Sequence, residues 1–83
     1  MDVYLITFRS VTPAQRGEGI LQREGISCRL GRTPRMLAEQ GCGYSIRVPG
    51  SQLHRAVELL RQKGIAYLKT YRLGDGNPEE VEP

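Results

Sequence analysis

The two halves of this chain follow one plan, and that repetition restricts the fold more than any other feature. Tyr4 precedes Gly25 by 21 residues, and Tyr44 precedes Gly64 by 20 residues. Before each glycine the residues are typical of a strand followed by a helix. After each glycine an isoleucine opens another β-forming run. The sequence therefore predicts two consecutive β-α-β units.

The first half begins with the β-forming run Tyr4–Phe8, which predicts a strand buried on both faces. Thr12 and Pro13 are residue types preferred at the N-cap and at the first position of a helix, so a helix is expected there. The next strand is predicted at Ile26–Leu30. Cys28 alternates with aliphatic residues in this strand and is therefore predicted to be structural.

The second half contains the clearest helix of the chain. A strand is expected at Tyr44–Val48, where polar and apolar residues alternate, and Ser51 is a candidate N-cap for the helix that follows. Gly64 suits the end of that helix, and Ile65–Leu73 is the final predicted strand. The apolar residues of the helix recur at i, i+3, i+4 and i+7, and they are Leu53, Ala56, Val57 and Leu60.

Residues 31–43 connect the halves and are too many for a tight hairpin. Thr33 and Pro34 indicate a helix start, and Gly41 indicates its end. The predicted fold is therefore α+β, a ferredoxin-like βαββαβ sandwich with two helices on one face of an antiparallel sheet and a short helical insertion between strands 2 and 3. Residues 1–73 form this single domain, and residues 74–83 form an acidic tail that is expected to be disordered.

Cys42 lies between Gly41 and Gly43 at the end of this insertion, and it is the candidate functional residue. Glycine permits unusual backbone angles and has no side chain to shield a neighbouring sulfur atom. A nearby guanidinium group lowers a thiol pKa from its usual value of about 8.5, and four arginines of the flanking segments are candidates for this effect. The C-terminus of the helix predicted before Cys42 has the opposite effect, because its negative partial charge disfavours a thiolate. The arginines are Arg29, Arg32, Arg35 and Arg47.

The charge of the chain is unevenly distributed. Residues 1–74 contain all 12 basic side chains and 5 of the 9 acidic ones, a difference of +7, and ten of the bases are arginine. The guanidinium group binds carboxylates and phosphates in a planar fork. Residues 1–74, the basic body of the chain, are therefore predicted to bind an anionic partner or to stabilise an anion. The alternative is a solvated basic surface without a specific role.

Several classes of protein are disfavoured by composition. No apolar stretch approaches the roughly 20 residues of a membrane span, and the start of the chain lacks the features of a signal peptide, which predicts a cytoplasmic protein with reduced cysteines. Two cysteines and one histidine are too few to close a zinc site, so no metal or other cofactor is expected. The single histidine, His54, lies off the apolar stripe of its helix and is predicted to be a solvated surface residue.

Three short motifs together resemble the small selenium/sulfur carrier-like family, which has been catalogued as a domain of unknown function. The resemblance covers about residues 3–72 and depends most on the combination of Thr-Pro-Arg with Cys-Gly. The chain departs from the family pattern at residues 38–41, where family members often have small hydroxyl side chains. The motifs are Leu5–Phe8, Thr33–Arg35, and Cys42-Gly43 followed by Arg47 three residues beyond Tyr44.

The resemblance implies that Cys42 accepts sulfur or selenium as a persulfide or selenopersulfide on an exposed loop. It implies Gly43 as the backbone neighbour of that thiol and Arg35 and Arg47 as candidate anion partners, and Arg32 is a further candidate from its position. The expected partners are a donor, such as a cysteine desulfurase, and an acceptor protein, so the chain is expected to be a carrier or accessory protein rather than a stand-alone enzyme.

Two other functions remain open from the sequence. One is a small nucleic-acid-binding or anion-binding module without thiol chemistry, which the basic body favours but the small number of aromatic residues disfavours. The other is a regulatory or assembly domain that binds a small anion or pairs its sheets into a homo-oligomer. Neither has a motif of its own in the chain.

Overall fold

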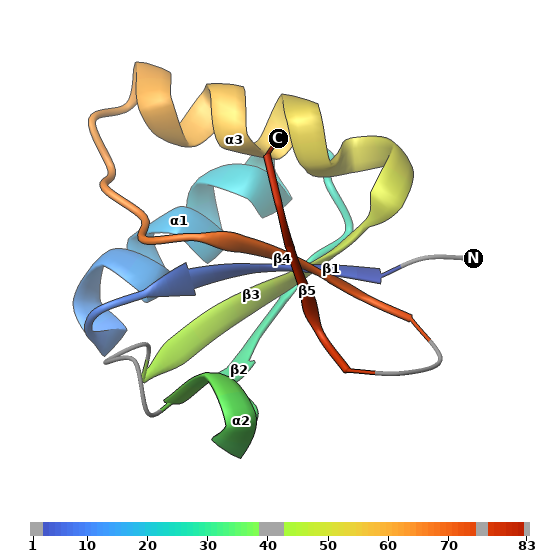
Figure 1. Ribbon diagram of the computed structural model, residues 1–83. Coiled ribbons are helices and arrows are strands. Elements are labelled where there is room, and N and C mark those ends of the chain that lie inside the picture. Colours follow the sequence, from blue (N-terminus) through green and yellow to red (C-terminus); the bar gives the residue numbers. More distant parts are fainter. Residues whose placement is uncertain (1–2, 39–42, 75–76, 83) are drawn as a thin grey trace.

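The computed structural model describes residues 3–38, 43–74 and 77–82, and it shows an α+β domain (Figure 1). A five-stranded sheet is combined with two long helices, α1 and α3, and with the short helix α2. The elements in chain order are β1 (Val3–Phe8), α1 (Val11–Arg23), β2 (Arg29–Arg32), α2 (Arg35–Ala38), β3 (Tyr44–Pro49), the 3-10 turn η1 (Gly50–Gln52), α3 (Leu53–Gln62), β4 (Thr70–Leu73) and β5 (Glu79–Val81).

The sheet is antiparallel throughout, with the strand order β2-β3-β1-β4-β5. β1 pairs with β3 from Val3↔Pro49 to Phe8↔Tyr44, and on its other side it pairs with β4. The end of β1 therefore lies beside the start of β3. This register places the first residues after β1 next to the last residues of the insertion.

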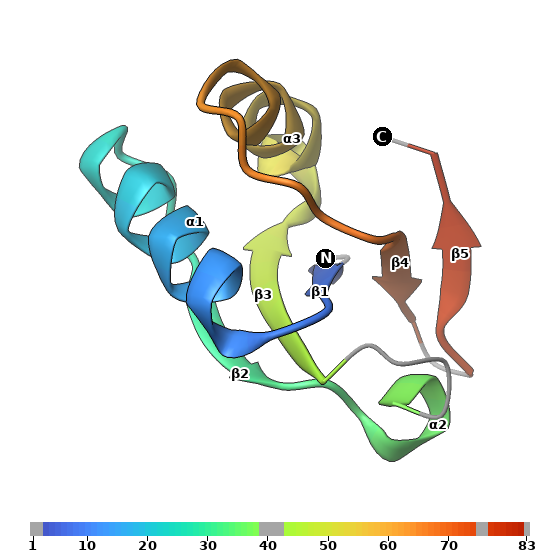
Figure 2. The same cartoon turned by 90° about the vertical axis from the view of Figure 1, so that its left-hand side faces the viewer.

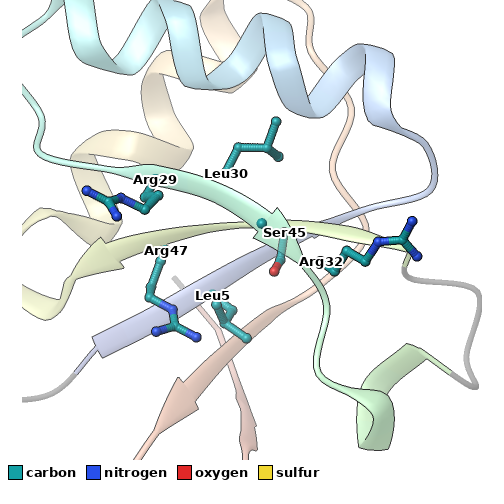
Figure 3. A pocket seen from close by; sticks show the side chains of 7 residues that line it. Leu5, Arg29, Leu30, Arg32, Ser45 and Arg47 are labelled. Carbon is teal, nitrogen blue, oxygen red and sulfur yellow. The ribbon is translucent and has the colours of Figure 1, made fainter.

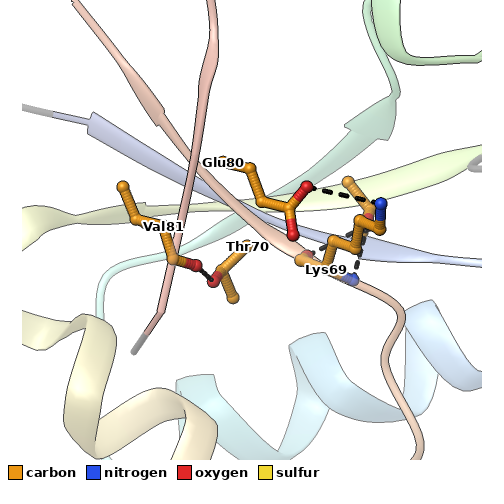
Figure 4. Close-up of polar contacts among 5 residues, drawn as sticks. Lys69, Thr70, Glu80 and Val81 are labelled. Atoms are coloured by element: carbon orange, nitrogen blue, oxygen red, sulfur yellow. Dashed lines mark hydrogen bonds and ion pairs between the residues drawn. The ribbon is translucent and has the colours of Figure 1, made fainter.

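The fifth strand corrects the expectation of a four-stranded sheet followed by a disordered tail. β5 pairs with β4 and extends the sheet by one strand, so the strand order differs from the predicted one. Opposite charges lie across the pairing, since Lys69 Nζ is 3.3 Å from Glu80 Oε1 and Arg72 Nη2 is 3.1 Å from Glu79 Oε1. The Thr70 hydroxyl also donates a hydrogen bond to the carbonyl oxygen of the third residue of β5 (Figure 4).

The helices α1 and α3 lie side by side on one face of the sheet, and α2 lies on the other (Figure 2). The main core fills the space between α1, α3 and the sheet, and the apolar residues predicted for α3 are all buried in it. On the opposite face Leu37 of α2 packs with Leu5 and Tyr71 in a smaller cluster. The main core comprises Ile6, Phe8, Ala14, Leu21, Ile26, Ile46, Val48, Leu53, Ala56, Val57, Leu60 and Ile65.

The repeated glycine-isoleucine pairs form the same turn twice. Gly25 and Gly64 have φ angles of 83° and 71°, in the left-handed region that glycine adopts without strain. The next residue, Ile26 or Ile65, donates its N–H to the carbonyl oxygen five residues earlier, at 2.9 Å in both cases. This is the Schellman motif, which ends a helix and directs the following apolar side chain back onto it.

These turns also correct the predicted strand boundaries. Ile26 and Ile65 are buried in the core, but pairing begins only at Arg29 and Thr70. The intervening residues are needed to cross from the helix layer to the sheet. The helix starts differ as well, since Ser10 rather than Thr12 is the N-cap of α1 and neither α1 nor α3 has a side-chain capping hydrogen bond.

At α3, the predicted cap Ser51 lies within the 3-10 turn η1, and Gln52 occupies the N-cap position. One turn of tighter helix therefore precedes α3. The predicted N-cap is therefore one residue early, an offset common at helix ends.

Two glycines of α1 are expected to respond to substitution in opposite directions. A Cβ atom at Gly19 would meet nothing within 4 Å, so Gly19→Ala should stabilise the protein by about 0.5–1 kcal/mol through the helix propensity of alanine. A Cβ atom at Gly17 would lie 3.1 Å from Leu60 Cδ2 and 3.2 Å from Ile46 Cδ1. Gly17→Leu should therefore cost about 1–3 kcal/mol or more through overpacking.

Urea denaturation of the two variants measures both effects, and the wild-type protein provides the reference midpoint. A Gly17→Leu variant as stable as Gly19→Ala would show that α1 does not lie close to the sheet at this position.

Candidate functional site

The predicted thiol, Cys42, lies outside the described residues, but the base of its loop is described. The β2–β3 ladder ends with the pair Arg32↔Tyr44. Beyond it, the N–H of Thr33 donates a hydrogen bond of 3.3 Å to the carbonyl oxygen of Gly43. The residue bonded to Cys42 is therefore held at the end of the ladder, against the Thr-Pro-Arg motif of the insertion.

Gly43 is exposed, and there is room for a side chain at its position. Among the glycines that the structure describes, positive φ angles occur at Gly25 and Gly64. A Cβ atom at Gly43 would meet the carbonyl oxygen of Arg9 at 3.9 Å, an ordinary contact. A side chain at Gly43 would therefore meet no close contact among the described residues.

Three arginines belong to this end of the sheet. Arg32 lies over the ring of Tyr44, with its guanidinium carbon 5.9 Å from the ring centroid, and Arg35 is exposed at the start of α2. Arg9 was not selected from the sequence. It follows β1 directly, and the antiparallel pairing of β1 with β3 brings it to Gly43. The β-α-β repeat contained this signal, because it implies that the end of β1 meets the start of β3.

Arg47 lies elsewhere on the sheet. It is four residues beyond Gly43, which corresponds to about 13 Å along an extended strand. Its direct neighbour in the ladder is Arg29, and both line a cavity of about 110 Å³ together with Leu5, Arg32 and Ser45 (Figure 3). The structure therefore places Arg32 opposite Tyr44, the residue after Gly43, and it places Arg47 opposite Arg29.

Thr33 has a buried hydroxyl group at the base of the insertion. The residue is only 7% exposed, and its Oγ1 atom has no hydrogen-bond partner among the described residues. The predicted capping hydrogen bond from Thr33 to the following helix is absent from this part of the chain. A buried hydroxyl without a partner is costly and so calls for an explanation at this position.

Residues 3–72 match a family described as "Putative Se/S carrier protein-like". The chain belongs to this family. The matched region includes the insertion, Cys42 and Gly43, and it ends before β5. No curated protein and no solved structure is significantly similar to the chain. The name of the family indicates carriage of selenium or sulfur and thus transfer partners in general.

The second cysteine of this family member, Cys28, has the surroundings of a structural residue. It is partly buried and packs against the main core, with its Sγ atom 3.8 Å from the carbonyl oxygen of Glu18. Burial, and then the negative charge of Glu18, raise the pKa of the Cys28 thiol above its ordinary value. Both effects disfavour the thiolate, which is the nucleophilic form.

Other functional groups are sparse in the described part of the chain. It contains no cluster of three or more histidine, cysteine, aspartate or glutamate residues that could hold a metal ion. His54 is exposed on α3, as predicted. Within the same residues no helix has the length and apolar character required to cross a bilayer.

Proposed function

We propose that this chain carries sulfur or selenium on Cys42, as a persulfide or selenopersulfide, from a donor such as a cysteine desulfurase to an acceptor protein. The family match over residues 3–72, which spans the Cys42-Gly43 pair, is the observation that supports this most. In the loading step the Cys42 thiolate attacks the outer sulfur of the donor persulfide. The donor S–S bond breaks, a new S–S bond forms on Cys42, and the donor leaves as a thiolate without net oxidation or reduction.

The described surroundings of Gly43 favour an anionic sulfur at its neighbour. The backbone of Arg9 reaches Gly43, Arg32 lies over Tyr44, and Arg35 belongs to the same insertion, so these three arginines are candidates for a positive charge that favours a thiolate. The unpartnered hydroxyl of Thr33 is a candidate hydrogen-bond donor to the same anion. It would replace the small hydroxyl residues that family members often carry just before the cysteine.

The comparison with Cys28 supports the choice of Cys42. A carrier thiol must be both ionised and accessible to two partner proteins in turn. Cys28 packs against the core and has a raised pKa, so it suits neither requirement. Cys42 is the other cysteine of the chain.

We further infer that residues 1–73 form a ferredoxin-like unit to which the C-terminal residues add β5. The first four strands lie in the order β2-β3-β1-β4, and both long helices pack on one face. The proposed carrier is a cytoplasmic accessory protein, not a stand-alone enzyme. It needs no cofactor, because its partners supply the second sulfur and the catalytic groups.

Mass spectrometry of the intact chain tests the carrier function. After incubation with a cysteine desulfurase and cysteine, the wild-type protein should gain the mass of one sulfur atom, which a reductant removes. Cys28→Ser should load equally, and Cys42→Ser should not load. Equal loading of the Cys42→Ser variant, or no loading of the wild type, would refute the proposal.

The structure gives no specific support to the nucleic-acid alternative. RNA-binding sheets of this type stack bases on aromatic side chains of the central strands. Here Tyr4 and Tyr44 pack against the main core on the helix side, and Phe8 is buried there. On the open face Tyr71 is only 3% exposed and packs with Leu37.

A further inference from the structure

Two arginines are direct neighbours on the open face of the sheet, the face opposite α1 and α3. Arg29 of β2 and Arg47 of β3 are direct partners in the antiparallel ladder, and both are exposed. Like charges directly opposite each other destabilise a sheet. The ion pairs found among the described residues involve Arg55, Arg61, Lys69 and Arg72, so no described carboxylate neutralises this pair.

A cavity of about 110 Å³ lies beside the two arginines (Figure 3). Gly31 of β2 pairs with Ser45 of β3, and a Cβ atom at Gly31 would meet nothing within 4 Å. The missing side chain therefore leaves open space over Ser45. Leu5 of β1 provides an apolar wall on the same face.

Ser45 adds a hydrogen-bonding group to this cavity. The residue is only 3% exposed, and its hydroxyl makes no hydrogen bond to another residue in the described ranges. Figure 3 shows its oxygen turned toward the same side of the sheet as Leu5 and Arg47. The cavity therefore combines the charges of Arg29 and Arg47, the hydroxyl of Ser45 and one apolar wall. Arg32 also lines it, but its guanidinium carbon lies 5.9 Å from the ring centroid of Tyr44.

We propose that the cavity between Arg29 and Arg47 binds a phosphate group. A carboxylate is satisfied by a single guanidinium fork, which would leave the second arginine without a partner. A phosphate monoanion or dianion offers oxygens in several directions and a charge of about −1.5 to −2 at pH 7, which matches two guanidinium groups. The cavity is about four times the share of volume of a liquid water molecule, roughly 30 Å³, and so has room for one such group.

This site goes beyond the carrier role and does not involve Cys42. It is also distinct from a second basic cavity, lined by Arg16, Ile20, Arg23 and Lys63. The basic residues of that cavity are all exposed, and no buried polar side chain lines it. Replacing Arg16 in this second cavity removes one positive charge, as Arg29→Gln or Arg47→Gln does, but leaves the proposed site intact. Arg16→Gln is therefore a matched control.

Titration of the full isotopically labelled chain with inorganic phosphate, at constant ionic strength and followed by NMR, tests the proposal. Saturable shifts are expected for the backbone amides of Gly31, Ser45 and Arg47. Arg29→Gln and Arg47→Gln should each weaken binding about tenfold, since one charge-assisted contact is lost. Arg16→Gln should change it by less than about twofold, the range of surface charge effects.

The pH dependence and other anions identify the ligand class. A phosphomonoester such as glycerol phosphate should bind more tightly as pH rises through its second pKa of about 6, whereas acetate should not saturate the site. Absence of saturable phosphate binding, equal weakening in all three arginine variants, or saturation by acetate as readily as by phosphate would each overturn the proposal. The proposal would also be overturned if the protein bound single-stranded RNA but neither inorganic phosphate nor glycerol phosphate.

Cys42→Ser separates this site from the carrier function. Phosphate binding should be unchanged in that variant even though sulfur loading is lost. A parallel loss of both would show that the two proposals describe one site, which would refute the separate phosphate site.

Discussion

Phe8→Ala is expected to lower the free energy of unfolding by about 3–5 kcal/mol, the usual cost of truncating a buried phenylalanine. Phe8 is 0% exposed and belongs to the main core between the sheet and the helices. Its ring reaches α1, because Cζ lies 3.5 Å from the Cβ position of Gly17. Truncation would leave a cavity where α1 meets β1.

The effect is large compared with the total stability of such a chain. At about 0.05–0.15 kcal/mol per residue, a domain of this size has roughly 4–12 kcal/mol in total. Phe8→Ala should therefore remove about a quarter or more of the total stability. Urea denaturation followed by circular dichroism measures the shift in midpoint.

Two controls make the result specific. Phe8→Leu retains most of the volume and should cost about half as much or less. Leu68→Ala removes an apolar side chain that is 36% exposed, and it should change stability by about 0.5 kcal/mol or less. A Phe8→Ala midpoint equal to that of Leu68→Ala would show that the core does not depend on this ring.

The repeated pattern predicted the parts of the fold that local chemistry determines. Gly25 and Gly64 end their helices in the left-handed conformation, as residues without a Cβ atom do at these positions. Leu53 and Leu60 are buried because the apolar stripe of α3 has helical spacing. Both the helix ends and the buried stripe of α3 are determined by residues that are close together in the sequence.

The fifth strand could not be predicted in this way. Glu79 and Glu80 have poor β-propensity and occur in an acidic, proline-containing segment, which locally resembles a disordered tail. Their strand conformation depends on the edge of β4 and on the charges of Lys69 and Arg72. Only the tertiary structure brings these groups together.

The positions of the arginines at the candidate site also depend on the tertiary structure and could not be predicted from local sequence. Arg47 is close to Cys42 in sequence and was selected for that reason, yet extended β3 carries it toward Arg29. Arg9 is far from Gly43 in sequence and adjacent in space. Distance along a strand grows by about 3.3 Å per residue, so a short separation in sequence is no guide to contact within a strand.

The rates at which the two cysteines are alkylated should differ by roughly fifteenfold or more at pH 7, with Cys42 the faster. A thiol with a pKa of about 8.5 or higher is about 3% ionised or less at that pH, whereas one activated to a pKa near 7 is about half ionised. Burial and Glu18 raise the pKa of Cys28, and burial also hinders the approach of a reagent.

The pH profile distinguishes ionisation from access. If Cys42 is activated to a pKa near 7, its rate with iodoacetamide should reach half its maximum near pH 7 and level off at about pH 8–8.5, where deprotonation is almost complete. The rate for Cys28 should still be rising above pH 9, because its pKa is raised. Trypsin cleavage after Arg23 and Arg29 isolates Cys28, and cleavage after Arg35 and Arg47 isolates Cys42, so one digest reports both.

Denaturant and a positioning variant complete this test of Cys42. In urea both thiols lose their surroundings, so the two rates should converge. Thr33→Val removes the unpartnered hydroxyl while keeping the shape of the side chain, and it should move the midpoint of the Cys42 profile to higher pH if that hydroxyl stabilises the thiolate. A native Cys42 that alkylates no faster than Cys28, or no faster than it does in urea, has no activated thiolate. Such a result would remove the chemical basis of the carrier function even though the family and the fold were unchanged.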